Sequence, residues 1–422
     1  MDDPAFQTPS IDLTTQTILL HASTHNLSAL KPLLRVPGNA SVQDPETGTT
    51  PLHAAISSLS LPETTEQDIE NAKTVVQELF LSGAIWNDLD GNNETPGCLA
   101  WKLGERGRGI YELCVNAGVR AEMLLGLMGG YEELGSEGGE EDEDVVEAET
   151  VDVEGENGTN GHTHDHELAV GPAEEMELEK EEGKRDVNSE DYLNSELTFE
   201  DDKLLDADAN GVMMAWETDI MRQTVDLLIP DLKPGARVLN IGFGMGIIDK
   251  MFKDTKPRSH HIIEAHPAVL KKLAEPGSQF GKAWEESAPE DGKYKIHAGR
   301  WQEVCPKLLE EGEVFDAIYF DTFGEDYSQL KLFFTEFVPG LLDGEGKFGF
   351  FNGLGADRRV CYDVYCRVAE LDLCDAGMDV DWTDVDVPVE GMEKEGEGEW
   401  KGVRRRYWTL DKYRLPTCTF LG

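Results

Sequence analysis

The sequence is poor in basic residues and has no long hydrophobic run. Its 422 residues include 37 lysines and arginines against 84 aspartates and glutamates, which gives a formal net charge of −47 at pH 7. Direct binding of a nucleic-acid backbone needs a basic surface, so this composition argues against that class of function. Because the chain shows no signal peptide and no run of about eighteen apolar residues, we expect a soluble, intracellular protein.

The acidic excess bears on the kind of partner that the protein binds, and the spacing of the cysteines bears on their role in the fold. An acidic surface favours a basic partner, such as a histone-like or ribosomal protein, but solubility alone explains the charge equally well. The seven cysteines are scattered, odd in number and without a Cys-x-x-Cys pair. Most have apolar neighbours, so we expect them to pack as small hydrophobic residues. The length leaves room for two or three domains.

Residues 10–128 show a helical, repeating pattern. The segment 48–56 reads Gly-Thr-Thr-Pro-Leu-His-Ala-Ala-Ile, which is similar to the Thr-Pro-Leu-His-x-Ala signature that opens an ankyrin repeat. An apolar helix is predicted at 72–81, a degenerate second copy at 93–118 and a capping repeat at 18–34. Two or three repeats are few for a free-standing solenoid. This all-α, ankyrin-like block is therefore a candidate to dock on the rest of the chain. It either binds a partner or only stabilises the protein.

Residues 131–190 have a different composition. They contain 23 acidic residues against three basic ones, with many glycines and few aromatics. Such a segment buries too little apolar area to offset the entropy of ordering, so we predict a disordered linker. Within it, His162-Thr-His-Asp-His166 is able to chelate a metal, but a lone motif of this kind in a flexible tract usually has no function. We therefore predict no metal site.

From residue 191 to residue 422, strands alternate with helices. This alternation predicts an α/β domain with a mostly parallel, Rossmann-like sheet that ends in an antiparallel pair. Helices are expected at 213–229, 267–273, 330–341 and 357–374. The expected strands are 237–241, 261–264, 294–297, 314–321 and 346–352, followed by the pair 378–387 and 404–410.

Three glycines follow the first of these strands at alternate positions, and Glu264 ends the second. The order strand, glycine turn, helix, strand and acid favours a nucleotide-type cofactor, with a purely structural turn as the alternative. Dehydrogenases and methyltransferases both begin this way. The closing antiparallel pair favours the class I methyltransferase architecture, and hence S-adenosylmethionine. The glycine turn would meet its methionine part, Glu264 its ribose, and Trp301 and Gln302 its adenine. Trp301 is otherwise explained as a partly buried core aromatic.

Six motifs in order over residues 213–355 make a resemblance specific. The sequence resembles guanidinoacetate N-methyltransferase and, more closely, the fungal type IV protein arginine N-methyltransferases, which modify the internal, delta nitrogen of arginine. The motifs are Trp216-Glu-Thr-Asp-Ile-Met221, Val238-Leu-Asn-Ile-Gly-Phe-Gly-Met-Gly246, Ile263-Glu-Ala-His266, Gly299-Arg-Trp-Gln-Glu-Val304, Phe320-Asp-Thr-Phe323 and Asn352-Gly-Leu-Gly355.

The resemblance implies a set of site residues. Two carboxylates, Glu217 and Asp321, would face the guanidine group as catalytic residues. The chain lacks the paired-glutamate loop of the common arginine methyltransferases, which supports a different target nitrogen. The implied cofactor-binding residues are Tyr192, Met221, Gly242, Phe243, Gly244, Met245, Gly246, Ile247, Glu264, Ala265, His266, Trp301, Gln302 and Asp321.

The chemistry of arginine agrees with two carboxylates. A guanidinium stays protonated in water and its lone pairs are delocalised, so it is a poor nucleophile. Carboxylates that accept its terminal N–H bonds would localise the charge there and aim one nitrogen at the methyl donor. Glu217 lies four residues before Met221, which predicts that one helical face presents both. A solvated helix acid is the alternative for Glu217.

The leading hypothesis is therefore S-adenosylmethionine-dependent methylation of the delta nitrogen of arginine in a basic protein, with a ribosomal protein as one candidate. Methylation of a small guanidino compound is the second hypothesis, and a non-catalytic ankyrin scaffold is the third. The resemblance also implies a location in cytoplasm and nucleus.

Overall fold

Residues 13–61, 63–136, 189–230, 234–388, 390–392 and 394–422 are described by a computed structural model. The chain divides into two compact units, Met1–Gly126 with Val187–Gly422, and Leu127–Asp186. All contacts and cavities below belong to the first unit. Most of the predicted linker and the histidine motif at 162–166 lie outside the described residues. Among the described helices, none is both long enough and apolar enough to span a membrane.

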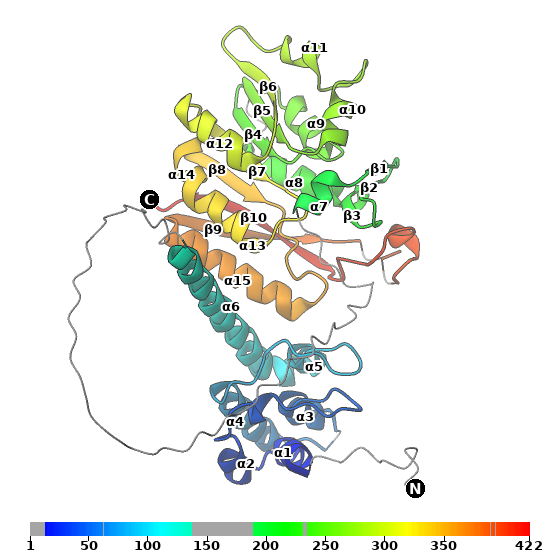
Figure 1. Ribbon diagram of the computed structural model, residues 1–422, viewed down its shortest axis with the longest axis vertical. Helices are drawn as coiled ribbons and strands as arrows, with labels where there is room; N and C mark the ends of the chain where they lie inside the picture. Colours follow the sequence, from blue (N-terminus) through cyan, green and yellow to red (C-terminus); the bar gives the residue numbers. More distant parts are fainter. Residues whose placement is uncertain (1–12, 62, 137–188, 231–233, 389, 393) are drawn as a thin grey trace, which may run out of the picture. The chain divides into compact units, whose positions relative to one another are not determined.

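The N-terminal region forms three consecutive helix pairs (Figure 1). Thr50 and Thr95 each begin the first helix of a pair, because their hydroxyls accept the N–H of the residue three positions later and a proline follows directly. The helices are α1 (Leu13–Ser23) and α2 (Leu27–Leu33), α3 (Pro51–Ser57) and α4 (Glu66–Leu81), and α5 (Pro96–Lys102) and α6 (Arg108–Ser136).

His53 explains the histidine of the Thr-Pro-Leu-His signature. Its ring is buried, with Nε2 2.9 Å from the carbonyl oxygen of Glu94 and Nδ1 2.8 Å from the Thr50 hydroxyl. Because a carbonyl only accepts, Nε2 carries the hydrogen and Nδ1 accepts. Burial lowers the pKa of this imidazole, which favours the neutral form. One side chain thus ties α3 to the loop that precedes α5.

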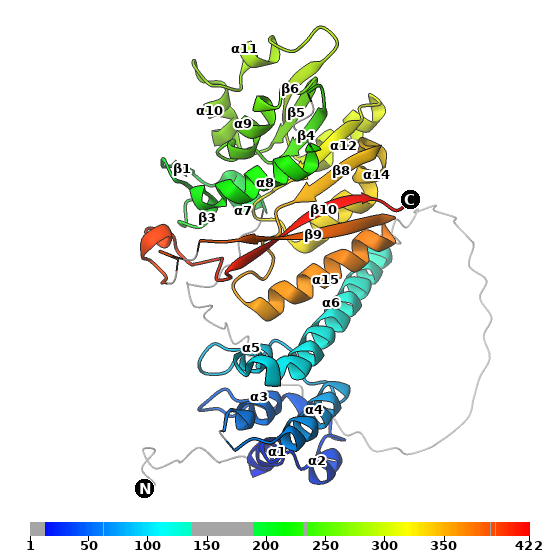
Figure 2. The ribbon, with the colours of Figure 1, turned by 180° about the vertical axis from the view of Figure 1, so that it is seen from behind.

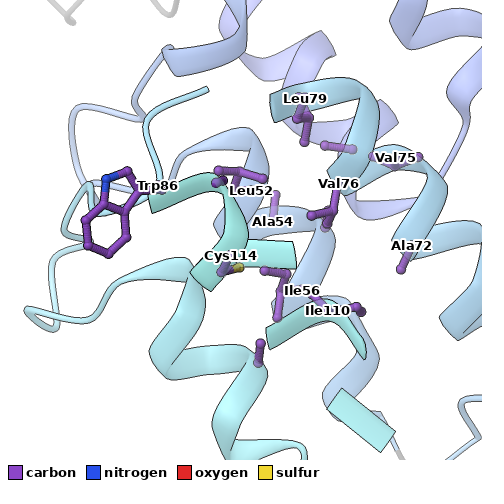
Figure 3. Close-up of a cluster of buried hydrophobic side chains, with 14 of the residues drawn as sticks. Leu52, Ala54, Ile56, Ala72, Val75, Val76, Leu79, Trp86, Ile110 and Cys114 are labelled. Atoms are coloured by element: carbon purple, nitrogen blue, oxygen red, sulfur yellow. The ribbon is translucent and has the colours of Figure 1, made fainter. Parts of the chain in front are cut away.

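The core of the helix pairs continues into the C-terminal half of the chain. Figure 3 shows its centre, where Leu52, Ile56, Val76 and Ile110 point toward one another. The same buried cluster includes Val360, Val364 and Val368. These valines come from helix α15 (Arg359–Asp375), which lies beside α6 in both views (Figures 1 and 2).

Close approach of these helices depends on two glycines and a polar network. A Cβ on Gly97 would lie 2.5 Å from Val360 Cγ2, and one on Gly118 would lie 2.6 Å from Val364 Cγ2. The Tyr111 hydroxyl donates to Asp363 at 2.5 Å, and Asp363 also pairs with Arg414 at 3.0 Å. The helical block therefore docks on α15, as its small size suggested.

The remaining residues build a seven-stranded sheet in the order β6-β5-β4-β7-β8-β10-β9 and a small three-stranded sheet, β1-β2-β3. Strands β4 to β8 pair in parallel, and β10 is antiparallel to both its neighbours. The strands are β1 (Thr198–Phe199), β2 (Lys203–Leu205), β3 (Gly211–Met214), β4 (Arg237–Ile241), β5 (Ser259–Glu264), β6 (Lys293–Ala298), β7 (Phe315–Phe320), β8 (Leu342–Phe350), β9 (Met378–Asp386) and β10 (Lys412–Phe420).

Helices cover both faces of the large sheet (Figures 1 and 2). One core layer joins the sheet to α12, α13, α14 and α15, and the other joins it to α8, α9, α10 and α11. The strand order reverses between β4 and β7, which is the position where open α/β sheets bind ligands. The helices are α7 (Ser189–Asn194), α8 (Thr218–Leu228), α9 (Ile247–Asp254), α10 (Pro267–Leu273), α11 (Lys282–Glu285), α12 (Trp301–Glu310), α13 (Tyr327–Leu332) and α14 (Val338–Leu341).

Three predicted elements need correction. The helix expected at 213–229 begins only at Thr218, because Met213 and Met214 belong to β3. The strand expected at 404–410 does not form, and β10 pairs with β9 instead. Apolar residues at 404–410 pack instead into a buried cluster that is rich in aromatic side chains. Pro416 lacks an N–H and is unusual inside a strand, so the sequence around it did not indicate β10. Helix α6 continues to Ser136, into the segment predicted as linker.

Candidate active site

The glycine turn follows β4 directly and needs glycine at Gly242. The residue has φ 92°, and a Cβ there would overlap the carbonyl oxygen of Asp321. The Asp321 N–H donates to the carbonyl oxygen of Ile241 at 2.9 Å. Gly246, also with positive φ, begins α9. The ends of β4 and β7 therefore touch at the point where the strand order reverses.

Glu264 braces this turn from the end of β5. One carboxylate oxygen accepts the N–H of Phe243 at 3.0 Å and that of Gly244 at 3.4 Å, and the other accepts the N–H of His266 at 2.6 Å. Burial raises the pKa of this carboxyl in spite of the backbone donors. The acid predicted to hold a ribose thus also fixes the shape of the loop that would carry the cofactor.

A cavity opens above the turn and brings together eight of the predicted cofactor residues. It has about 630 Å³ of empty space, its open mouth included. The eight residues are Tyr192, Gly242, Gly244, Glu264, Ala265, Trp301, Gln302 and Asp321. The cavity is also lined by residues that were not among the predicted cofactor-binding ones, namely Ser189, Leu193, Val212, Met213, Ile241, Ile263, Gly299, Arg300, Thr322, Phe323 and Glu325.

The other predicted cofactor residues support the wall without being among its lining residues. The Phe243 ring packs on Phe280 with centroids 5.4 Å apart, and Met221 is fully buried in the core. His266 Nε2 lies 3.0 Å from the Tyr192 carbonyl oxygen, so it donates there and holds α7 over the cavity. Met245, Gly246 and Ile247 follow the turn and lead into α9.

Glu325 is the polar centre of the cavity's far wall. Its carboxylate accepts from the Trp301 indole at 3.0 Å, from the Gln302 amide at 2.9 Å and from the Thr322 hydroxyl at 2.6 Å. Trp301 is otherwise buried against Phe320 and other aromatics, so it is both a core residue and part of the cavity wall. No pattern in the sequence marks Glu325, because its partners come from α12 and from the loop after β7.

The lining fits S-adenosylmethionine. Gln302 Oε1 is buried and has no hydrogen-bond partner among the described residues, so it offers an acceptor for the amino group of an adenine. Glu264 offers carboxylate oxygens for ribose hydroxyls. When bound, S-adenosylmethionine supplies an electrophilic methyl group on a sulfonium sulfur.

Asp321 separates this cavity from a second one. The second cavity has about 550 Å³ of empty space, its open side included, and Asp321, Thr322 and Glu325 line both. Its other lining residues include Phe351, Gly353 and Leu354 from the loop that follows β8. Removal from bulk water raises the pKa of Asp321 to about 7.

Glu217 is the second predicted catalytic acid. It ends a short 3-10 turn before α8 and is 4% exposed. Burial, together with the nearby charge of Asp321, raises the pKa of its carboxyl to about 8. Asp321 therefore lies close enough to influence the ionisation of Glu217, although Glu217 is not among the lining residues of either cavity. A cation bound by both acids would favour their charged forms.

Tyr407 was missed by the sequence prediction. Its hydroxyl donates to Glu217 Oε1 at 2.6 Å, while the Met214 N–H donates to Oε2 at 3.2 Å. The tyrosine ring packs between Trp216 and Trp400, with centroids 6.0 and 4.9 Å away. Tyr407 comes from the segment that was predicted as a strand, and it holds the buried carboxylate in one orientation.

Comparison with known proteins identifies the family. Residues 185–346 match the family of guanidinoacetate N-methyltransferase. Protein arginine N-methyltransferase 2 of Gibberella zeae is 56% identical over 401 residues, which cover 93% of this chain and 90% of that protein. Its namesake from Neurospora crassa is 54% identical, with 96% of each chain covered. The chain belongs to the protein arginine N-methyltransferase 2 family.

Membership of this family confirms the family resemblance that was inferred from the sequence motifs. The chain is an enzyme, a methyltransferase that uses S-adenosylmethionine. Among solved structures, fibrillarin from Aeropyrum pernix with S-adenosyl-L-methionine matches with a TM-score of 0.30 and 14% identity, over 56% of this chain and 84% of that one. A likeness this distant says nothing about individual site residues.

Proposed function

We propose that this enzyme methylates the delta nitrogen of arginine residues in a basic protein, with a ribosomal protein as the candidate class. One observation carries the proposal. Asp321 lines both the cofactor cavity and the second cavity, and Glu217 lies close enough to share its electrostatic field. Asp321 at the boundary between two cavities, with the buried Glu217 near it, is suited to hold a cationic side chain against a methyl donor.

The arginine guanidinium would satisfy both carboxylates at once. Its terminal N–H groups would donate to Glu217 and Asp321, and the positive charge would lower the raised pKa of each acid. Positioning of this kind contributes roughly 7–11 kcal/mol to a two-reactant step. With the terminal nitrogens held, the internal nitrogen is the one left to face the cofactor cavity.

The proton balance assigns a second role to Asp321. A new N–CH₃ bond forms while the S–CH₃ bond breaks, and the electron pair of the broken bond stays on sulfur. The methylated guanidine keeps one positive charge, so one proton must leave the guanidinium. Asp321, which lines the cofactor cavity and would hold a terminal N–H of the guanidinium, is placed to accept it.

The helical block and the acidic charge fit a protein substrate. Its three helix pairs, with the His53 contact between neighbours, support our proposal that it is an ankyrin-like repeat block. The net charge of −47 would attract basic proteins. Location in cytoplasm and nucleus stays a proposal that rests on the family resemblance.

A labelling experiment tests this function. Enzyme and methyl-labelled cofactor are incubated either with acid-extracted basic protein or with guanidinoacetate, and the labelled amino acid is identified after hydrolysis. We expect label on the internal nitrogen of protein arginine. Label confined to guanidinoacetate would refute the proposal in favour of the small-molecule alternative, and label on a terminal nitrogen would refute the choice of nitrogen.

Two variants test the role of the carboxylates directly. Glu217→Gln and Asp321→Asn keep the size of each side chain and remove its charge, so each is expected to lower turnover at least ~10³-fold. Cofactor affinity is measured in parallel, because Asp321 lines the cofactor cavity as well. Full turnover in either variant would refute the carboxylate clamp.

A further inference from the structure

A third cavity is a groove between the helical block and the catalytic domain. It has about 1850 Å³ of empty space, its open side included, compared with about 550 Å³ for the second cavity. One wall comes from α5, through Gly97 and Trp101, and the other comes from residues 357–360, 406 and 408–411.

The groove and the candidate active site are lined by neighbouring residues on two stretches of chain. Leu354 lines the second cavity and Asp357 lines the groove, so only two residues lie between them, and at most ~11 Å of chain separates the two. Arg406 and Trp408 line the groove, while Tyr407 between them donates to Glu217. A polypeptide whose arginine enters the second cavity would therefore reach the groove within a few residues.

The groove is also preformed. Tyr111, Asp363 and Arg414 form a hydrogen-bonded network under it, and the valines of α15 lie in the core of the helical block. Because both walls are held by the same core, binding there would not require the block and the catalytic domain to be ordered first. Preorganisation of this kind strengthens binding, because no binding free energy is lost in ordering a mobile site.

The lining indicates what the groove would bind. Trp101 is 52% exposed, and the Arg359 guanidinium lies 4.7 Å above its ring. Arg359 also pairs with Asp411 at 2.5 Å, and Arg358 pairs with Asp357 at 3.0 Å. Four basic and four acidic residues line the groove, whereas the whole chain has 84 acidic residues against 37 basic ones. This balanced surface is therefore not a general attractor for cations.

We propose that this groove binds an extended segment of the substrate protein next to the target arginine. Guanidinium groups offer five donors each, so those of Arg358 and Arg359 can hold main-chain carbonyl oxygens in addition to their ion pairs. The exposed face of Trp101 would take a nonpolar side chain of the segment. The inference rests on the proposed function, and it assigns the helical block a direct part in substrate recognition.

Three variants of the full chain test the groove. Trp101→Ala and Arg359→Ala remove its exposed ring and the cation above it, while Leu20→Ala removes an equally exposed apolar side chain on α1, outside the groove. With acid-extracted protein as substrate, we expect both groove variants to lose at least ~10-fold in methylation rate, as for a central tryptophan or arginine of an interface. The Leu20→Ala rate and the cofactor affinity of all three should match the wild type.

A photo-crosslinking residue in place of Trp101 locates the bound segment. After labelling, we expect the crosslinked peptide to lie within a few residues of the methylated arginine. Wild-type rates in both groove variants, or crosslinks only to distant parts of the substrate, would refute the groove and leave the proposed function intact. Absence of label in every protein with wild-type enzyme would refute the proposed function and the groove together.

Discussion

At the scale of single residues, the ionisation of Glu217 depends on Tyr407. The tyrosine hydroxyl donates to the carboxylate and lowers its pKa, while burial and Asp321 raise it to about 8. A guanidinium binds to the ionised acid, so kcat/KM should rise with pH between about 6 and 9 as Asp321 and then Glu217 lose their protons.

Tyr407→Phe tests this dependence. Without the hydroxyl, the charged form of Glu217 loses a donor, its pKa rises further, and the acidic limb of the kcat/KM profile should move up by about one pH unit, since one unit corresponds to about 1.4 kcal/mol. The control is Tyr294→Phe on β6, which removes a tyrosine hydrogen bond to the Pro257 carbonyl oxygen. An unchanged limb in Tyr407→Phe would mean that the tyrosine only fills space.

The same acid links stability to pH. The pKa of the Glu217 carboxyl rises from the ordinary glutamate value of 4.5 to about 8 in the fold. Between these values the native state holds a proton that the unfolded state has released, so this contribution to the free energy of unfolding is full below pH 4.5 and is lost as pH rises through 8. The site thus weakens the fold in the pH range where it is active.

Glu217→Gln resembles the protonated acid at every pH. We expect it to raise the free energy of unfolding by roughly 2–4 kcal/mol at about pH 8.5 and to have little effect near pH 5. Urea unfolding at the two pH values measures the difference, with Glu303→Gln on the exposed face of α12 as control. Equal stability of Glu217→Gln and wild type at the higher pH would contradict a strongly raised pKa.

At the scale of elements, the approach of α6 to α15 depends on a missing side chain. Gly118 faces Val364 and Trp86, which leave no room for a Cβ, whereas Gly126 on the same helix has nothing within 4 Å. Alanine raises helix propensity by about 1 kcal/mol at either position. The two glycines therefore differ only in what lies opposite them.

This difference predicts opposite effects of one substitution. Gly126→Ala should stabilise the full chain by ~0.5–1 kcal/mol, while Gly118→Ala should destabilise it by ~1–3 kcal/mol because the added methyl overlaps the valine. Both are measured by urea unfolding. If Gly118→Ala were also stabilising, the two helices would not be packed as closely as the valine contact requires.

The elements predicted from the sequence are those with a local cause. The strand over Arg237–Ile241 and the helix over Pro267–Leu273 form as expected, because a short apolar run or a proline at the first helical position acts within a few residues. Glu264 and Asp321 lie at the predicted sheet edge for the same reason. Tyr407 could not be predicted, since its partner Glu217 is 190 residues away and nothing near Tyr407 indicates the contact.

At the scale of the whole molecule, the active site takes a cation into a chain with a net charge of −47. The field of such a chain extends about 10 Å into solvent at about 0.1 M ionic strength and raises the encounter rate of basic proteins by roughly 10-fold or more. The balanced groove contributes little to this attraction. Charge therefore attracts basic proteins to the surface of the enzyme. The groove and the two acids then select the segment and the arginine that bind.

This division of roles predicts a salt dependence that differs between substrates. For a basic protein, kcat/KM should fall roughly 10-fold between low salt and about 0.5 M salt, because screening removes the long-range attraction. For a neutral peptide that contains one arginine, the decrease should be much smaller, since the short-range contacts with Glu217 and Asp321 are buried and weakly screened. Equal salt dependence for the two substrates would mean that the acidic surface serves solubility alone.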